Sequence, residues 1–285
     1  MGAAAAEEKL YGSIEDLVLG QPIDAALGLE DRLCAPNLHA LIVKGVEGIQ
    51  EEVDALALSC IEGAQEVKDW LHYIRHEQTS ERQFPNGIRD EGRNGYDLAY
   101  FLTHPCAQKA NLNEAHVVSL RLYTTPAFRF INKPLRDLGR HAANQQCPLP
   151  GTSYWADQAI KKLRAVNTQQ GEAVTHWRGM QNRKAAADFV LRGGTELAFL
   201  STTSDLEVAV SYALSQSSLF FKIVAGNFLT TAVDVQWLSA FPSESEKLYP
   251  PLTFLQPTGR AETLTVQRGV ETLCITVMEV HPTIG

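Results

Sequence analysis

The segment FPSESEKLYPP, residues 241–251, carries two glutamates, Glu244 and Glu246, that a single serine separates. In an extended backbone the side chains alternate with a period of two, so both carboxylates would lie on one face, about 6–7 Å apart. Like charges at that spacing repel, and proteins keep them together mainly where one of them has a dedicated partner or a function. A Glu-x-Glu beside proline is by itself most often a solvated loop. Its interpretation therefore depends on the rest of the sequence.

The composition narrows the class of protein. The chain has 285 residues, 45% of them hydrophobic, which is enough for one large domain or two smaller ones with a substantial core. Its 25 basic and 33 acidic residues give a formal net charge of −8. This balance argues against a nucleic-acid-binding protein that works through a general basic surface. No apolar run approaches the ~20 residues of a membrane-spanning helix, so no membrane span is predicted.

The N-terminus and the cysteines predict a soluble protein of a reducing compartment. The start, MGAAAAEE, lacks the basic region and the apolar core of a signal peptide. The five cysteines are widely scattered and include no C-x-x-C pair, which predicts neither a disulfide framework nor a zinc site. We therefore expect free thiols and a cytoplasmic location, while secretion by a route without a cleaved signal stays open.

The first 80 residues are predicted to be helical. Apolar residues recur at steps of three and four, at Ile42, Val46, Ile49, Val53, Leu56 and Cys60 and again at Val67, Leu71 and Ile74. Charged residues such as Glu52 lie off this stripe. Gly45, Gly48 and Gly63 each weaken a helix by about 1 kcal/mol relative to alanine, which favours two helices over one. The stripe either packs on its own domain, which is the commoner outcome, or forms a partner surface.

The remaining sequence changes from helical to β-rich character. Residues 79–95 form a polar segment with a Pro-Asn-Gly turn, which is typical of a linker or loop. We therefore divide the chain into a helical N-terminal segment, residues 1–80, and a second domain, residues 81–285. Helices are predicted over residues 96–102, 113–123, 127–138 and 153–165. Strands are predicted over residues 173–178, 197–202, 219–224, 231–236, 252–255, 262–267 and 272–280. One helix, residues 208–213, interrupts them after a capping box that runs from Ser204 to Glu207. The sum predicts an α+β fold with a mostly antiparallel sheet.

Three polar segments stand at the ends of predicted strands. They are His176-Trp177-Arg178-Gly179, then Phe199-Leu200-Ser201-Thr202-Thr203-Ser204, and then Glu244-Ser245-Glu246 followed by Tyr249-Pro250-Pro251-Leu252-Thr253-Phe254. Each segment alone also fits ordinary strand-end or helix-capping chemistry. The sequence contains no G-x-G-x-x-G, G-x-x-x-x-G-K-[ST], H-E-x-x-H or G-x-S-x-G motif. Its eight histidines show no ligand spacing, so no metal is predicted.

In their order, spacing and flanks these segments resemble the arginine-specific mono-ADP-ribosyltransferases, whose signature is an arginine, a Ser-Thr-Ser-like triplet and a Glu-x-Glu. The resemblance covers roughly residues 95–282 and includes Leu122-Tyr123-Thr124 and Ile131-Asn132-Lys133-Pro134-Leu135-Arg136. It implies a mixed, mostly antiparallel sheet with flanking helices. It also implies NAD as the substrate, an arginine of a protein acceptor as the target, and no metal.

The resemblance assigns roles to individual residues. Cleavage of NAD develops positive charge on the ribose, and a carboxylate close by stabilises that charge most in the transition state. By resemblance this carboxylate is Glu246, which would also bind a ribose hydroxyl, and Ser201 would orient it through a hydrogen bond. Arg178 would bind the NAD pyrophosphate, because its guanidinium is planar and permanently charged. Gly179 would let the backbone reach the nicotinamide amide, since it has no Cβ.

Glu244 is the residue that the resemblance assigns to the acceptor. In the resembled family a glutamate at this position goes with arginine as the target. A carboxylate can pair with a guanidinium and help to remove a proton as the nitrogen attacks. Thr202 and Thr203 would complete the NAD-binding triplet with Ser201. Thr203 departs from the commonest third residue of that triplet, although it keeps a hydroxyl.

Several assignments stay open. Trp237 and Phe241 are candidates for the acceptor surface. Tyr212, Phe220 and Phe221 are candidates for stacking on nicotinamide, although core packing is favoured for each. Two other functions compete with transfer to arginine: an NAD glycohydrolase that passes ADP-ribose to water, and a catalytically silent ADP-ribosyltransferase-like binding module. The sequence also leaves open whether such an enzyme is a toxin or a housekeeping modifier.

Overall fold

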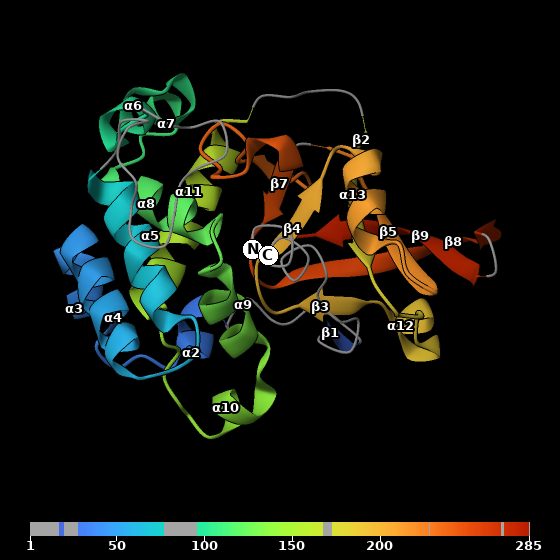
Figure 1. The fold of residues 1–285 in the computed structure, drawn as a ribbon, viewed down its shortest axis with the longest axis horizontal. Coiled ribbons are helices and arrows are strands. Elements are labelled where there is room, and N and C mark those ends of the chain that lie inside the picture. Colours follow the sequence, from blue (N-terminus) through green and yellow to red (C-terminus); the bar gives the residue numbers. More distant parts are fainter. Residues whose placement is uncertain are drawn as a thin grey trace. The chain divides into compact units, whose positions relative to one another are not determined.

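A computed structural model of the chain describes residues 17–19, 28–76, 96–167, 173–227, 229–268 and 271–284 (Figure 1). These residues fall into two compact units. The sheet unit consists of the described parts of Met1–Ala26, Asn167–Asp234 and Glu244–Gly285, and the helical unit consists of those of Leu27–Val166 and Val235–Ser243. The predicted boundary near residue 80 stays a prediction, and the polar segment 79–95 lies outside the described residues.

The helical unit buries the apolar stripe that the sequence predicts. Its helices are α2 (Leu29–Leu33), α3 (Leu38–Lys44), α4 (Val46–Leu58), α5 (Ala64–His76), α6 (Leu98–Thr103), α7 (Pro105–Lys109), α8 (Glu114–Tyr123), α9 (Phe128–Arg136), α10 (Leu138–Ala142) and α11 (Pro150–Ala165). Stripe residues such as Ile49, Val53 and Leu71 are fully buried where α4 and α5 pack on each other and on α8. Cys60, at the end of the first run, is exposed. Among the helices of the described residues there is no candidate for a membrane-spanning segment.

Glycines divide the predicted N-terminal helix into three parts. Gly45 has φ +59° and is both the C-cap of α3 and the N-cap of α4. A residue with a side chain adopts this conformation only with strain, so the glycine sets the break. Gly48 stays inside α4, where an added Cβ would lie 2.3 Å from the carbonyl oxygen of Leu41. Gly45 therefore ends α3, Gly48 lets α3 and α4 approach each other, and Gly63, with φ +82°, directly precedes α5.

The sheet unit contains a mixed sheet, as predicted. Its strands are β1 (Leu17–Leu19), β2 (Val174–Met180), β3 (Gly194–Glu196), β4 (Leu200–Thr203), β5 (Ser217–Ala225), β6 (Val233–Asp234), β7 (Glu246–Tyr249), β8 (Thr253–Arg268) and β9 (Glu271–Thr283). Within the described residues they pair in the order β1-β3-β8-β9-β5-β2-β4-β7-β6. The β5–β9 pair is parallel, and the other pairs are antiparallel. The helices α12 (Ala187–Arg192) and α13 (Leu206–Ala213) belong to the same unit. The 3-10 helix η3 (Pro242–Glu244) begins in the helical unit and ends in the sheet unit at Glu244.

Some predicted elements differ from the structure. The two strands predicted at 252–255 and 262–267 are one long strand, β8, which keeps its pairing with β9 through a bulge between Pro257 and Ala261. The strand predicted at 231–236 is reduced to two residues. The N-cap of α13 is Asp205 and not the predicted Ser204, because the Asp205 side chain accepts hydrogen bonds from the backbone N–H groups of Glu207 and Val208. Local patterns locate these elements but not their ends.

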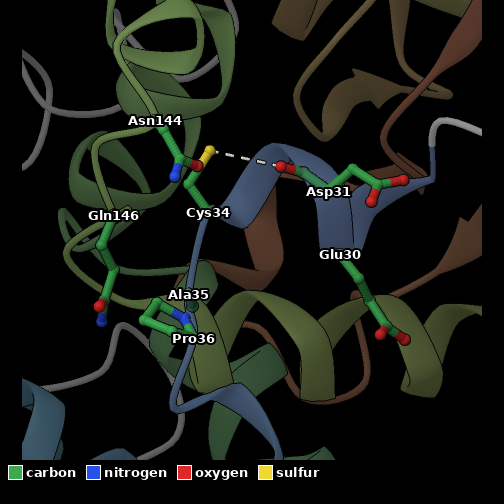
Figure 2. A pocket seen from close by; sticks show the side chains of 7 residues that line it. All are labelled: Glu30, Asp31, Cys34, Ala35, Pro36, Asn144 and Gln146. Carbon is green, nitrogen blue, oxygen red and sulfur yellow. Dashed lines mark hydrogen bonds between the residues drawn. The ribbon is translucent and has the colours of Figure 1, made fainter.

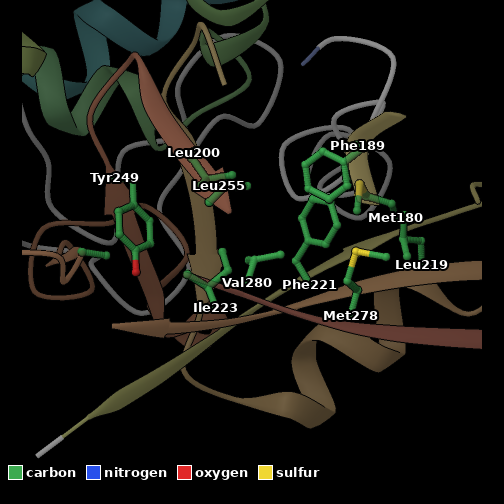
Figure 3. Packing of buried hydrophobic residues seen from close by; sticks show 11 residues of the cluster. Met180, Phe189, Leu200, Leu219, Phe221, Ile223, Tyr249, Leu255, Met278 and Val280 are labelled. Atoms are coloured by element: carbon green, nitrogen blue, oxygen red, sulfur yellow. The ribbon is translucent and has the colours of Figure 1, made fainter. Parts of the chain in front are cut away.

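The sheet is packed on both faces around β2 and β5. On one face a cluster forms around Phe189 and Phe221, whose stacked rings have centroids 5.2 Å apart, with Met180 and Met278 beside them (Figure 3). On the other face α13 lies along β2 and β5 (Figure 1). There Phe220 packs with Ala209 and Ala213 of the helix. Phe220 and Phe221 are thus core residues, as favoured from the sequence.

Gly179 lies where α13 meets β2, which gives it a structural reason to lack a side chain. An added Cβ would lie 2.4 Å from the Cβ of Ala213 and 2.9 Å from the carbonyl oxygen of Ala209. We therefore expect Gly179→Ala to lower the free energy of unfolding by about 1–3 kcal/mol through overpacking. Urea denaturation measures this change. Gly226→Ala is the matched control, because no atom lies within 4 Å of its added Cβ. Equal stability of the two variants would contradict the prediction.

Candidate active site

The three polar segments of the sequence lie on three neighbouring strands of the sheet unit. Arg178 is on β2, Ser201 on β4 and Glu246 on β7, and these strands are adjacent in the order β2-β4-β7. The register pairs Trp177 with Thr203 and Thr203 with Glu246. Directly opposed residues of antiparallel strands project to the same face. The face that carries Thr203 therefore carries Ser201 and Glu246 as well.

Ser201 and Glu246 form the contact that the sequence predicts. The hydroxyl of Ser201 donates a hydrogen bond to Oε1 of Glu246 at 2.7 Å. Ser201 is 0% and Glu246 is 1% exposed. A hydrogen bond to a carboxylate is stronger than one between neutral groups, and burial strengthens it further. One oxygen of Glu246 is thus fixed by β4.

Arg178 contacts the backbone of β4 and an acidic residue, Glu196, to which the sequence motifs assign no role. Its Nη1 donates to the carbonyl oxygen of Ser201 at 3.4 Å, and its Nη2 lies 3.8 Å from Oε2 of Glu196. Because side chains alternate along a strand, the side chains of Arg178 and Trp177 project from opposite faces of β2. The only sequence feature that could have indicated Glu196 as a site residue is its position directly before the apolar run Leu197–Leu200. Its partner is 18 positions away, and only the fold brings the two together.

The two threonines of the triplet hydrogen-bond to the Glu-x-Glu segment. Thr202 Oγ1 donates to the carbonyl oxygen of Lys247 at 2.8 Å. Thr203 Oγ1 donates to the carbonyl oxygen of Glu244 at 2.8 Å and accepts from the N–H of Asp205 at 3.0 Å. These hydroxyls therefore tie β4 to the residues around Glu246. Their assignment to NAD stays a prediction.

The Glu-x-Glu segment is not extended, so the parallel projection of its two carboxylates is not realised. Glu244 ends the 3-10 helix η3, and Glu246 begins β7. Ser245, between them, has φ +48°, which is the left-handed region. This conformation turns the chain sharply and costs free energy in a residue that has a side chain. Both carboxylates belong to buried residues, but no common strand face sets their separation.

His176 is a buried residue of the first segment to which neither the motifs nor the resemblance gave a role. Its Nδ1 lies 3.0 Å from the hydroxyl oxygen of Tyr249, and both residues are buried. Burial, and then the charge of Lys247, lower the pKa of His176 to about 4. The imidazole is therefore neutral at pH 7 and links β2 to β7 through the tyrosine.

The buried His176 predicts a loss of stability in mild acid. The pKa of this imidazole is about 4 in the folded chain, whereas that of a free histidine side chain is 6.5. Between these values the unfolded state binds more protons, so the contribution of His176 to the free energy of unfolding falls by about 3 kcal/mol as the pH drops from 6.5 to 4. Urea denaturation across this range measures this contribution as the difference between the slopes of the wild type and His176→Gln. The exposed His281→Gln controls for the loss of a surface imidazole, and an unchanged slope in His176→Gln would contradict the prediction.

Two aromatic residues proposed for the acceptor surface pack within the helical unit. Trp237 stacks on His104, with ring centroids 4.5 Å apart, and Phe241 meets Trp70 edge-on at 6.2 Å. Two of the hydrogen bonds that hold the backbone between them come from the end of α8. Arg121 Nη1 donates to the carbonyl oxygen of Leu238 at 2.8 Å, and the N–H of Ala240 donates to Thr124 Oγ1 at 3.0 Å. Trp237 and Phe241 remain half-buried.

A pocket of about 540 Å³ in the helical unit contains none of the predicted site residues (Figure 2). It is lined by Glu30, Asp31, Cys34, Ala35, Pro36, Asn144 and Gln146. The thiol of Cys34 donates to the carbonyl oxygen of Asp31 at 3.3 Å, while the carboxylates of Glu30 and Asp31 point in different directions. Over the described ranges no group of three or more His, Cys, Asp and Glu side chains is placed to hold a metal ion.

Comparison with known proteins points to one family. The family model described as "NAD:arginine ADP-ribosyltransferase" matches residues 72–268. No curated protein sequence matches the chain. Similar solved structures include the ADP-ribosyltransferase HopU1 of Pseudomonas syringae, at 18% identity over 76% of this chain and 97% of that one, with a TM-score of 0.48. They also include the eukaryotic mono-ADP-ribosyltransferase ART2.2, at 15% identity over 95% and 92%, with a TM-score of 0.46. The toxin Plx2a of Paenibacillus larvae matches at 19% identity over 60% and 88%, with a TM-score of 0.43.

Proposed function

The chain belongs to the NAD:arginine ADP-ribosyltransferase family, and from that premise we propose that it transfers ADP-ribose from NAD to arginine side chains of a protein acceptor. The observation that carries the proposal is the buried hydrogen bond of 2.7 Å from Ser201 to Glu246. A carboxylate that is already oriented needs no reorganisation when charge develops next to it.

Glu246 supports the first half of the reaction. When the bond between nicotinamide and ribose breaks, its electron pair leaves with the nicotinamide nitrogen and the ribose becomes cationic. The carboxylate of Glu246 stabilises this charge more in the transition state than in the ground state. Ser201 holds Oε1 of Glu246, so the hydroxyl keeps the carboxylate in one orientation.

NAD binding is assigned to the arginine and to the residues next to it. The guanidinium of Arg178 offers a permanent charge and a planar set of donors for the pyrophosphate. Gly179 follows it on β2 and would bring a backbone group to the nicotinamide amide. Thr202 and Thr203 would act through the backbone that they hold around Glu246.

Glu244 supports the second half of the reaction and its choice of acceptor. A guanidinium nitrogen of the acceptor arginine attacks the ribose carbon that the nicotinamide has left. The nitrogen then loses a proton, which a carboxylate can accept. Glu244 stands before Glu246 at the end of η3, and the hydroxyl of Thr203 fixes its carbonyl oxygen at 2.8 Å. Pairing of Glu244 with the planar guanidinium would favour arginine over other acceptors.

The proposal is tested by separating transfer from cleavage. The wild type and Glu244→Gln are incubated with NAD and an arginine analogue, the adduct is followed by mass spectrometry, and released nicotinamide is measured in parallel. We expect Glu244→Gln to lose about 10²-fold or more in adduct formation, the usual contribution of a general base, while nicotinamide release persists. The exposed Glu262→Gln is the control for the loss of a carboxylate.

Three outcomes would overturn the proposal in different ways. Equal loss of both activities in Glu244→Gln would remove the division of roles between the two glutamates. Nicotinamide release by the wild type without any adduct, from the analogue or from arginine-containing protein, would make the chain an NAD glycohydrolase. Thermal stabilisation by NAD with no release at all would make it a silent binding module.

A further inference from the structure

Glu196, Arg178, Ser201 and Glu246 form a continuous series of polar contacts inside the sheet unit. Glu196 Oε2 lies 3.8 Å from Arg178 Nη2, Arg178 Nη1 lies 3.4 Å from the carbonyl oxygen of Ser201, and Ser201 Oγ lies 2.7 Å from Glu246 Oε1. All four residues are at most 3% exposed. The family signature accounts for three of them. Glu196, at the far end, has no assigned role.

Glu196 is held rigidly from both its side chain and its backbone. Its Oε1 accepts a hydrogen bond from the N–H of Ala198 at 2.9 Å, which leaves Oε2 directed to the arginine. Its carbonyl oxygen accepts from the N–H of Leu252 at 2.8 Å, and its register partner on β8 is Thr253. The carboxylate therefore offers Arg178 a fixed anionic partner.

A fixed anion matters here because a buried guanidinium stays charged. Arginine does not lose its proton in proteins, so burial has to be compensated by an anion or by hydrogen bonds. The carbonyl oxygen of Ser201 is neutral and satisfies part of this need. With Glu196 on one side and Ser201 on the other, the guanidinium links β3 to β4 at the residue whose hydroxyl holds Glu246.

We propose that Glu196 is a positioning residue for the catalytic Glu246 and acts through Arg178 and Ser201. This inference rests on the proposed NAD cleavage at Glu246. Loss of the Glu196 carboxylate releases the guanidinium, which weakens its hydrogen bond to the carbonyl oxygen of Ser201, and the hydroxyl of Ser201 then holds Oε1 of Glu246 less firmly in its productive orientation. Small misplacements of a catalytic group cost rate in the chemical step, so the effect falls on kcat.

The test measures steady-state nicotinamide release by the full chain as kcat and KM for NAD. For Glu196→Gln we expect kcat to fall about tenfold, with KM nearly unchanged. The matched control is Glu279→Gln, which removes another buried glutamate of the sheet unit from its ion pair with Lys222 at 3.1 Å. A loss of general stability would appear in both variants, whereas a positioning effect appears only in Glu196→Gln.

A double-mutant cycle shows whether the effect passes through the serine. Ser201→Ala removes the hydroxyl that holds Glu246, so adding Glu196→Gln to it should cost little further in kcat. Glu196→Asp keeps the negative charge on a side chain one carbon shorter, and it should lower kcat less than Glu196→Gln does, with KM nearly unchanged. This variant keeps the test decisive if Glu196→Gln does not fold.

Several results would overturn the inference. The first is that Glu196→Gln and Glu279→Gln have the same kcat. The second is that the effects of Glu196→Gln and Ser201→Ala on kcat are independent in the double mutant. The third is that Glu196→Gln changes KM for NAD and leaves kcat unchanged. The third result would mean that Glu196 affects only the binding of NAD by Arg178. A wild type that releases no nicotinamide would instead refute the proposed function itself, and this outcome is seen before any variant is compared.

Discussion

Glu246→Gln is expected to lower nicotinamide release from NAD by about 10²–10³-fold, the usual cost of losing one preorganised electrostatic group. The substitution keeps the size of the side chain and an oxygen that can accept from Ser201, but it removes the negative charge. A neutral amide cannot stabilise a cationic ribose, so release and transfer fall together. The measurement is nicotinamide release under saturating NAD, with thermal unfolding to confirm that the variant is folded.

A weaker variant of the same site supplies the comparison. Ser201→Ala leaves the carboxylate of Glu246 in place and removes one charge-assisted hydrogen bond, so we expect release to fall about tenfold. We therefore expect the rate of nicotinamide release to decrease from the wild type to Ser201→Ala and further to Glu246→Gln. Release by Glu246→Gln at a rate equal to or above that of Ser201→Ala would show that the charge at position 246 does not carry the cleavage step.

Glu52→Ala is expected to lower the free energy of unfolding by about 3–5 kcal/mol, because it removes buried hydrogen bonds and leaves a cavity. Glu52 is a buried residue of α4 whose carboxylate accepts from the N–H groups of Gly151 and Thr152 and from the hydroxyl of Thr152. These N–H groups lie in the first turn of α11, where a helix has no partners of its own and favours an anion. Urea denaturation followed by the helical signal measures the loss.

The same residue gives this unit a pH dependence opposite in sign to that of His176. Burial raises the pKa of Glu52 to about 7 from 4.5, although the hydrogen bonds from Gly151 and Thr152 lower it. Between these values the folded state binds more protons, so the contribution of Glu52 to the free energy of unfolding falls by about 3 kcal/mol as the pH rises from 4.5 to 7. Glu52→Gln should lack this contribution, so its slope should differ from that of the wild type by this amount. If Glu52→Gln keeps the wild-type slope, another group titrates in this range.

Glu52 also shows where prediction from a local pattern fails. On the helical repeat it lies off the apolar stripe, which is the pattern of a solvated side chain. It is buried because the N-terminus of α11, about 100 positions further along the chain, packs over it. The pattern of one helix does not indicate which polar residue will meet the end of another helix. The stripe itself was predictable, because residues such as Ile49 and Val53 share one face through the helical repeat alone.

The residues of the candidate site could be selected from the sequence because each belongs to a short segment with its own local signal. A polar triplet after an apolar run, an Arg-Gly at a strand end and a Glu-x-Glu beside prolines can all be recognised without a structure. The hydrogen bond from Ser201 to Glu246 followed from the resemblance and is present at 2.7 Å. The conformation between the two glutamates was not predictable, since the left-handed Ser245 depends on what precedes and follows it in space.

The sequence by itself determined the α+β class, the change from helices to strands along the chain, and three of the four buried polar residues in the series that ends at Glu246. These depend on periodicity and on short motifs, which act over a few residues. The tertiary structure decided the fourth group, Glu196, and the partners of Glu52 and His176. Each of these depends on strand order, register or helix packing between residues 18 to about 100 positions apart. Burial then makes such a pairing necessary, because a charged or polar group inside the protein is stable only where the fold provides its partner.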